Sequence, residues 1–102
     1  MVVYDKLVRD RIPEIIRRNG DTPVFRILNE TDYWTYLLKK DSEELEEVRL
    51  AETSEERKKE LADKLEVLRA MAEYQGFSLE DILMEADRKK EKNGGFEERI
   101  CL

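Results

Sequence analysis

The sequence predicts a mostly α-helical protein built around a central helical hairpin. Residues 30–51 and 54–75 each repeat apolar side chains at the spacing of an α-helix. The short connection between them favours a tight turn and an antiparallel pair of helices. A chain of 102 residues is expected to form one domain, residues 1–102, with a modest core. Because the apolar face of each long helix is unfavourable to leave exposed to solvent, we expect hairpins from two chains to form a four-helix bundle, in a homodimer or homotetramer.

Local signals define the flanking elements. Pro13 suits the first turn of a short helix over about 12–19, and Asn19-Gly20 is typical of a helix end. Residues 23–28 are β-branched and aromatic, which predicts a short strand. The tail 96–102 alternates apolar and polar residues and is the expected partner, so the sequence predicts a small two-stranded β element.

Capping residues predict where the longer helices begin. Asn29 or Thr31 can cap the first long helix. Thr53, followed by Glu56, matches a capping box at the start of the second. Ser78 opens a further helix that runs to about Lys92, where the sequence Asn-Gly-Gly closes it.

Composition excludes several classes of function. The net charge is −6, which argues against a nucleic-acid polymer as partner because phosphate backbones favour positive surfaces. No apolar run approaches the roughly 20 residues of a membrane span, and the N-terminus has no signal-peptide core. The single cysteine, Cys101, precludes an internal disulfide and indicates a cytoplasmic protein. Without any histidine, catalysis would depend on carboxylates, lysines, arginines or a metal.

Two acidic stretches, "SEELEEV" (42–48) and "ELADKLE" (60–66), lie on the long helices. Helical angles place four carboxylates at the borders of the apolar stripes: Glu44, Glu47, Glu60 and Asp63. Antiparallel packing would bring the two pairs together, and desolvated carboxylates that converge need a compensating charge, such as Mg²⁺. The same spacing also occurs on solvated faces of Glu-rich helices, so geometry leaves both interpretations open.

Three motifs in order resemble a known superfamily. "EELEE" (43–47) followed by "ELAD" (60–63) resembles the EExxE…ExxD signature of the all-α nucleoside triphosphate pyrophosphohydrolases. "YDKLVRDRIPEII" (4–16) and "EKNGGFEERICL" (91–102) look like the first and last blocks of a MazG-like subgroup, often labelled phosphoribosyl-ATP pyrophosphohydrolase-like. The resemblance therefore covers essentially the whole chain. Asn93 departs from the arginine usual in that subgroup, which puts one phosphate contact in doubt.

The resemblance implies Mg²⁺-dependent hydrolysis of a nucleotide between its α and β phosphates, with Mn²⁺ as an alternative metal. The products would be a nucleoside monophosphate and pyrophosphate, as in housekeeping of the nucleotide pool. Carried over by position, the metal ligands are Glu44, Glu47, Glu60 and Asp63. Either Glu44 or Glu47 would orient or deprotonate the attacking water.

Two basic segments offer phosphate contacts. Lys6 and Arg9 belong to the N-terminal block, and Arg88 and Lys92 lie near the C-terminal one. Surface ion pairing is the alternative for all four residues, and cations near a helix C-terminus also suit its dipole.

Aromatic residues offer a surface on which a base could stack. Tyr4, Trp34 and Tyr36 are the candidates, although a core or interface role is favoured for Trp34. Two charged residues raise a separate question, because Asp41 and Lys64 each interrupt an apolar stripe. A lone buried charge is unfavourable, so we expect the two to pair directly, within about 6 Å.

Two alternatives to nucleotide housekeeping remain. A phosphoribosyl-ATP pyrophosphohydrolase of histidine biosynthesis would share the metal motif. A non-catalytic helical oligomerisation or adaptor module would have no need to keep four acids beside its core. Stabilisation by Mg²⁺ plus a nucleotide would separate this last alternative from the enzymes.

Overall fold

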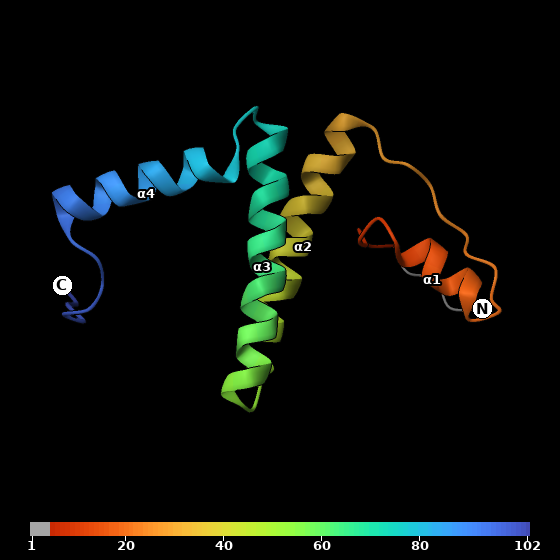
Figure 1. Ribbon diagram of the computed structural model, residues 1–102, viewed down its shortest axis with the longest axis horizontal. Helices are drawn as coiled ribbons and strands as arrows, with labels where there is room; N and C mark the ends of the chain where they lie inside the picture. Colours follow the sequence, from red (N-terminus) through yellow and green to blue (C-terminus); the bar gives the residue numbers. More distant parts are fainter. Residues whose placement is uncertain (1–4) are drawn as a thin grey trace.

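The computed structural model describes residues 5–102, so the predicted base stacking by Tyr4 lies outside the described residues. Its centre is a hairpin of two long antiparallel helices, α2 (Glu30–Leu50) and α3 (Ser54–Tyr74). The shorter helices α1 (Ile12–Arg18) and α4 (Leu79–Asn93) extend to opposite sides of it (Figure 1). The predicted mostly α-helical fold with a central hairpin is confirmed.

Side-chain caps begin the three longer helices as the sequence predicts. Asn29 rather than Thr31 caps α2, because its Oδ1 accepts from the Asp32 N–H at 2.8 Å. Thr53 caps α3 and Ser78 caps α4 in the same manner. The predicted capping box at Thr53 is not completed, because the Glu56 carboxylate accepts from the Glu52 N–H at 2.9 Å rather than from that of Thr53. The Ser78 cap is a complete capping box, since the Asp81 carboxylate accepts in return from the Ser78 N–H at 2.8 Å.

Gly76 makes the corner between α3 and α4. Its φ of 88° lies in the left-handed region, which glycine adopts without steric penalty. The Phe77 N–H then donates back to the Ala72 carbonyl at 2.9 Å, as expected of a helix C-terminus that ends on glycine. This corner directs α4 away from the hairpin (Figure 1).

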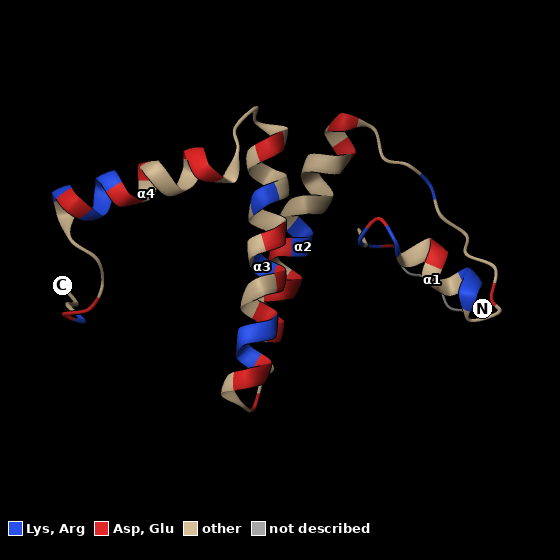
Figure 2. Cartoon of the chain, in the orientation of Figure 1, with Lys and Arg blue, Asp and Glu red and all other residues tan. Residues whose placement is uncertain are grey.

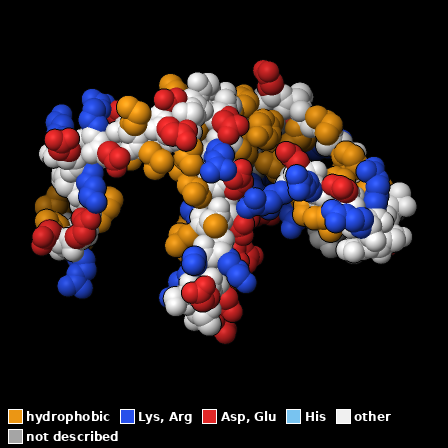
Figure 3. All heavy atoms as spheres, viewed as in Figure 1, with side chains coloured by type: hydrophobic (Ala, Val, Ile, Leu, Met, Phe, Trp, Pro, Cys, Tyr) orange, Lys and Arg blue, Asp and Glu red, His pale blue; other side chains and the backbone are white. Residues whose placement is uncertain are grey.

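The core of the single chain is small and lies between α2 and α3. Its buried apolar residues are Leu37, Val67 and Ala72, of which Leu37 is only 1% exposed. Much of the remaining apolar surface of the hairpin is open, as with Leu61 at 55% exposed, and apolar side chains are visible on the surface in Figure 3. Among residues 5–102 no helix is long and apolar enough to cross a bilayer.

A hydrogen-bonded tether holds the start of the described chain against α2. The Tyr36 hydroxyl donates to Asp5 Oδ1 at 2.7 Å and accepts from Arg26 Nη2 at 3.0 Å. Arg26 comes from the extended segment between α1 and α2, so three separate parts of the chain meet here. The tether brings the N-terminal arm, residues 5–11, back towards the hairpin.

The predicted β element is wrong: residues 5–102 contain no strand. Residues 21–29 run on the α1 side of the hairpin, whereas the C-terminal tail follows α4 on the opposite side (Figure 1). An extended segment needs a partner to form ladder hydrogen bonds, and this separation removes it. The tail also turns back on itself, because the Arg99 N–H donates to the Phe96 carbonyl and Arg99 has a φ of 56°.

The predicted pair between Asp41 and Lys64 is confirmed. Lys64 Nζ donates to Asp41 Oδ1 at 2.7 Å, joining α3 to α2 across the hairpin. Each charge therefore has its counter-ion where the apolar stripes meet, which offsets the penalty of partial burial.

Candidate metal centre

Three predicted acids meet where α2 and α3 face each other. One carboxylate oxygen from each of Glu44, Glu60 and Asp63 lies within 4.8 Å of the other two. Glu60 and Asp63 are three residues apart and so share one face of α3, and antiparallel packing places Glu44 of α2 opposite them. Glu44 is only 9% exposed, whereas the other two are partly exposed. We call these three residues the acidic cluster.

Glu47, the fourth predicted ligand, lies next to the acidic cluster and not within it. It follows Glu44 by three residues on α2, so the two share a helix face. Its negative charge is one of those that raise the pKa of Glu60. The structure therefore brings Glu47 near the cluster without making it part of the convergent set.

The cluster has the character of a site for a hard cation. Burial raises the pKa of the Glu60 carboxyl, and the charges of Asp63, Glu47 and Glu44 raise it further. The convergent donors are all carboxylate oxygens, which suit Mg²⁺ or Mn²⁺ better than soft metals that prefer sulfur. A divalent cation would relieve this repulsion, so the residues present fit the metal that the sequence motif implies.

Two basic side chains border the cluster. Arg9 Nη2 lies 2.7 Å from Asp63 Oδ1, so an ion pair brings the N-terminal arm to the cluster, while phosphate binding by Arg9 stays a prediction. Lys40 Nζ lies 3.5 Å from Glu44 and 3.4 Å from Glu43. Lys40 was not predicted, although its position four residues before Glu44 was a usable signal because residues at that spacing are neighbours on a helix.

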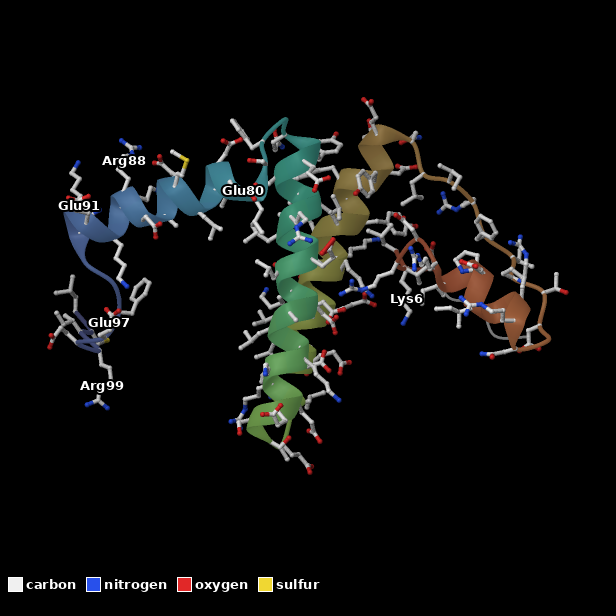
Figure 4. All side chains as sticks on the ribbon, in the orientation of Figure 1. Lys6, Glu80, Arg88, Glu91, Glu97 and Arg99 are labelled. Atoms are coloured by element: carbon white, nitrogen blue, oxygen red, sulfur yellow. The ribbon has the colours of Figure 1, made fainter. Side chains whose placement is uncertain are left out.

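The other basic candidates lie differently. Lys6 belongs to the same arm as Arg9 and lies beside the hairpin (Figure 4). Arg88 projects from α4 away from the hairpin, and its Nε donates to Glu85 at 3.1 Å on the same helix. Lys92 lies further along α4, among the basic residues at its far end (Figure 2). Within one chain, Arg88 and Lys92 are therefore not brought to the acidic cluster.

A groove of about 480 Å³ adjoins the cluster between the N-terminal arm and the hairpin. Two cluster members, Glu44 and Asp63, line it together with both bordering cations. The full lining is Leu7, Val8, Arg9, Asp10, Arg11, Tyr33, Leu37, Lys40, Glu44, Asp63, Glu66, Val67, Ala70 and Glu73. A second hollow, of about 420 Å³ at the corner between α3 and α4, contains none of the predicted site residues.

The aromatic residues are placed differently from the sequence prediction. Trp34 stacks on Tyr74 with ring centroids 5.1 Å apart, which agrees with the packing role favoured for it. Tyr36 is occupied by the tether to Asp5 and Arg26. Neither ring lines the groove, whereas Tyr33 does. Tyr33 lies four residues before Leu37 on α2, and this spacing was the sequence signal that both side chains share one face of the helix.

Comparison with known proteins gives one partial relationship. The chain is similar to an uncharacterized protein of Mycolicibacterium smegmatis (strain ATCC 700084 / mc(2)155), with 54% identity over 48 residues. The match covers 47% of this chain and spans about half, 49%, of the relative's length. No protein-family model matches the chain, and no solved structure matches it.

Proposed function

We propose that the protein is a Mg²⁺-dependent nucleoside triphosphate pyrophosphohydrolase. It would cleave between the α and β phosphates and act on the nucleotide pool of the cytoplasm. The observation that carries the proposal is the convergence of Glu44, Glu60 and Asp63 from two helices beside a groove with basic residues at its edge. Carboxylates and cations placed together suit a metal–phosphate substrate, which carries charges of both signs.

Each charged residue has a proposed role. Glu44, Glu60 and Asp63 would hold the Mg²⁺, which when bound neutralises charge on the phosphates. Arg9 would bind phosphate oxygens through the paired N–H groups of its guanidinium, and Lys40 would add a point charge. Glu47, adjacent to the cluster, is the carboxylate proposed to orient and deprotonate the attacking water.

We also propose that two hairpins associate through their open apolar faces. Leu45 of α2 and Leu61 and Leu65 of α3 are 57%, 55% and 43% exposed. Because only three apolar residues among 5–102 are buried, the chain would gain most of its core by pairing. Sedimentation should show a dimer or tetramer that Leu65→Glu converts to a smaller species. The same change at the exposed Leu83 of α4 serves as the control, and equal effects would argue against a hairpin interface.

The direct test is pyrophosphate release with Mg²⁺ across a panel of substrates. The panel would contain ordinary triphosphates, oxidised or deaminated ones, and phosphoribosyl-ATP, so the preferred substrate would separate housekeeping from histidine biosynthesis. We expect Asp63→Asn to abolish release, whereas Asp87→Asn on α4 keeps it. A folded protein that neither releases pyrophosphate nor binds Mg²⁺ would instead support the oligomerisation module.

A further inference from the structure

The groove has two chemically different ends. One face of α2 carries Tyr33, Leu37, Lys40 and Glu44 in succession along it. At 1.5 Å per residue, the backbone positions of Tyr33 and Glu44 are about 16 Å apart. The charged end adjoins the acidic cluster, and Tyr33 marks the other end. An elongated ligand with its phosphates at the cluster would extend its opposite part towards Tyr33.

Packing orients the Tyr33 ring at its end of the groove. Tyr33 and Tyr74 make an edge-to-face contact with ring centroids 6.0 Å apart, and Tyr74 in turn stacks on Trp34. Tyr33 is half-buried, so part of the ring is held by the hairpin while the residue still lines the groove. A ring fixed in this manner can stack on a planar ligand with little loss of side-chain entropy.

Two carboxylates accompany Tyr33. Asp10 of the N-terminal arm and Glu73 of α3 both line the groove, and burial together with their two charges raises the pKa of the Tyr33 phenol. Within residues 5–102, neither side chain has a hydrogen bond or ion pair. An ionised carboxylate only accepts hydrogen bonds, so this end of the groove is suited to a planar group that donates them.

We propose that Tyr33, Asp10 and Glu73 form the base-recognition subsite and select nucleotides whose base carries an exocyclic amino group. This inference rests on the proposed nucleotide pyrophosphohydrolase and names its substrate class. The amino group of cytosine, adenine or guanine donates to the carboxylates, whereas the O4 oxygen of uracil or thymine would face them unpaired. The apolar Leu37, Val67 and Ala70 between the two ends offer no competing hydrogen bonds.

Pairs of nucleoside monophosphates with related bases test the proposed base selection without any hydrolysis. Titration calorimetry with Mg²⁺ would compare GMP with IMP, which differ in one amino group, and CMP with UMP, in which a carbonyl replaces the amino group and N3 gains a proton. We expect the amino-bearing member to bind about tenfold more tightly or better, as hydrogen bonds to charged groups are the strong ones. Asp10→Asn combined with Glu73→Gln should reduce this ratio to near one, because amides also donate. Glu80→Gln, outside the groove, should leave it unchanged.

The contribution of Tyr33 to nucleotide binding can be measured separately from that of the two carboxylates. Tyr33→Leu should weaken all four monophosphates by about tenfold and leave the ratios intact, because stacking tolerates every base. Tyr33→Phe keeps the ring and should retain binding, so it is the control for a loss of binding that comes only from misfolding of Tyr33→Leu. Equal affinity within both pairs, in a protein that still hydrolyses triphosphates, would overturn the base subsite alone. No binding of any nucleotide would overturn both it and the proposed function.

Discussion

The two basic segments look alike in the sequence and differ in the structure. One lies within and the other lies at the edge of a block that resembles the same family, and both contain predicted phosphate-binding residues. Arg9 pairs with Asp63, 54 residues away, and so lies at the acidic cluster. Arg88 pairs with Glu85, three residues away on its own helix, and projects from the hairpin. Local charge therefore does not determine which basic segment reaches the acidic cluster.

The difference has two local causes. The tether between Asp5, Tyr36 and Arg26 folds the N-terminal arm onto α2, which brings Arg9 over α3. The corner at Gly76 and the capping box at Ser78 direct α4 outward, so its basic end is remote from the cluster of the same chain. Chain connections rather than charge therefore decide the role of each segment.

The largest effect on activity is expected from a substitution at the acidic cluster of the hairpin. Glu44→Gln should lower kcat/KM for pyrophosphate release by at least about a hundredfold, because it removes a buried negative ligand of the proposed Mg²⁺. Glu80→Gln on α4 should change it less than about twofold. A Glu44→Gln protein with normal activity and normal Mg²⁺ affinity would remove the acidic cluster from the mechanism.

The next effect compares the two arginines directly. Arg9→Ala should lower kcat/KM by about 10- to 100-fold, since charge-assisted contacts to phosphate are strong, and Arg9→Lys should recover part of the loss. Arg88→Ala should stay within about twofold of the unchanged protein. Steady-state kinetics on the three variants would check this. A larger loss for Arg88→Ala would show that α4 reaches a site, most directly that of a second subunit.

A smaller effect is expected on the free energy of unfolding, where an ion pair between two helices is compared with an ion pair within one helix. A double-mutant cycle on Asp41 and Lys64 should give a coupling of about 1 kcal/mol in urea unfolding, because this pair is part-buried and joins α2 to α3. The Glu85–Arg88 pair within α4 should give a smaller coupling, because both side chains are exposed to solvent and water screens their charges. Equal couplings would mean that the cross-hairpin pair adds no more than a surface contact.

The smallest effect is a pH dependence of the tether. The hydrogen bond from Tyr36 holds the pKa of Asp5 below its ordinary value, with help from Arg26. Since the folded-state pKa is lowered, the stabilisation is present above the ordinary value and is lost as the pH falls through the lowered one. Carboxyl NMR titration should return the Asp5 pKa towards the ordinary range in Tyr36→Phe. An unchanged pKa would mean that the tether is absent in solution.

Local and periodic signals account for what the sequence predicted correctly. The apolar repeats and caps such as Asn29 depend on neighbours within one or two turns, so the helices and their boundaries were predictable. The acidic cluster followed because Glu60 and Asp63 share a face and a short turn fixes α2 against α3. The Asp41–Lys64 pair was predictable for the same reason.

Long-range placement accounts for what the sequence did not predict. The expected strand over 23–28 lacks a partner because α1 and α4 extend to opposite sides of the hairpin. Arg88 and Lys92 were assigned from charge, although the direction of α4 depends on the corner at Gly76. The spacing of Tyr33 to Leu37 gives its face of α2, but Tyr33 lines the groove because the N-terminal arm lies over that face, and this placement was not predicted.

The proposed reaction is the attack of water on the α-phosphorus of a nucleotide at the acidic cluster. Hydrolysis with Mg²⁺ in ¹⁸O-labelled water, followed by ³¹P NMR of the products, tests it most directly. We predict a nucleoside monophosphate and pyrophosphate, with the label in the monophosphate, and no products from Asp63→Asn. A nucleoside diphosphate and phosphate, or no hydrolysis by a folded protein, would contradict the proposed reaction.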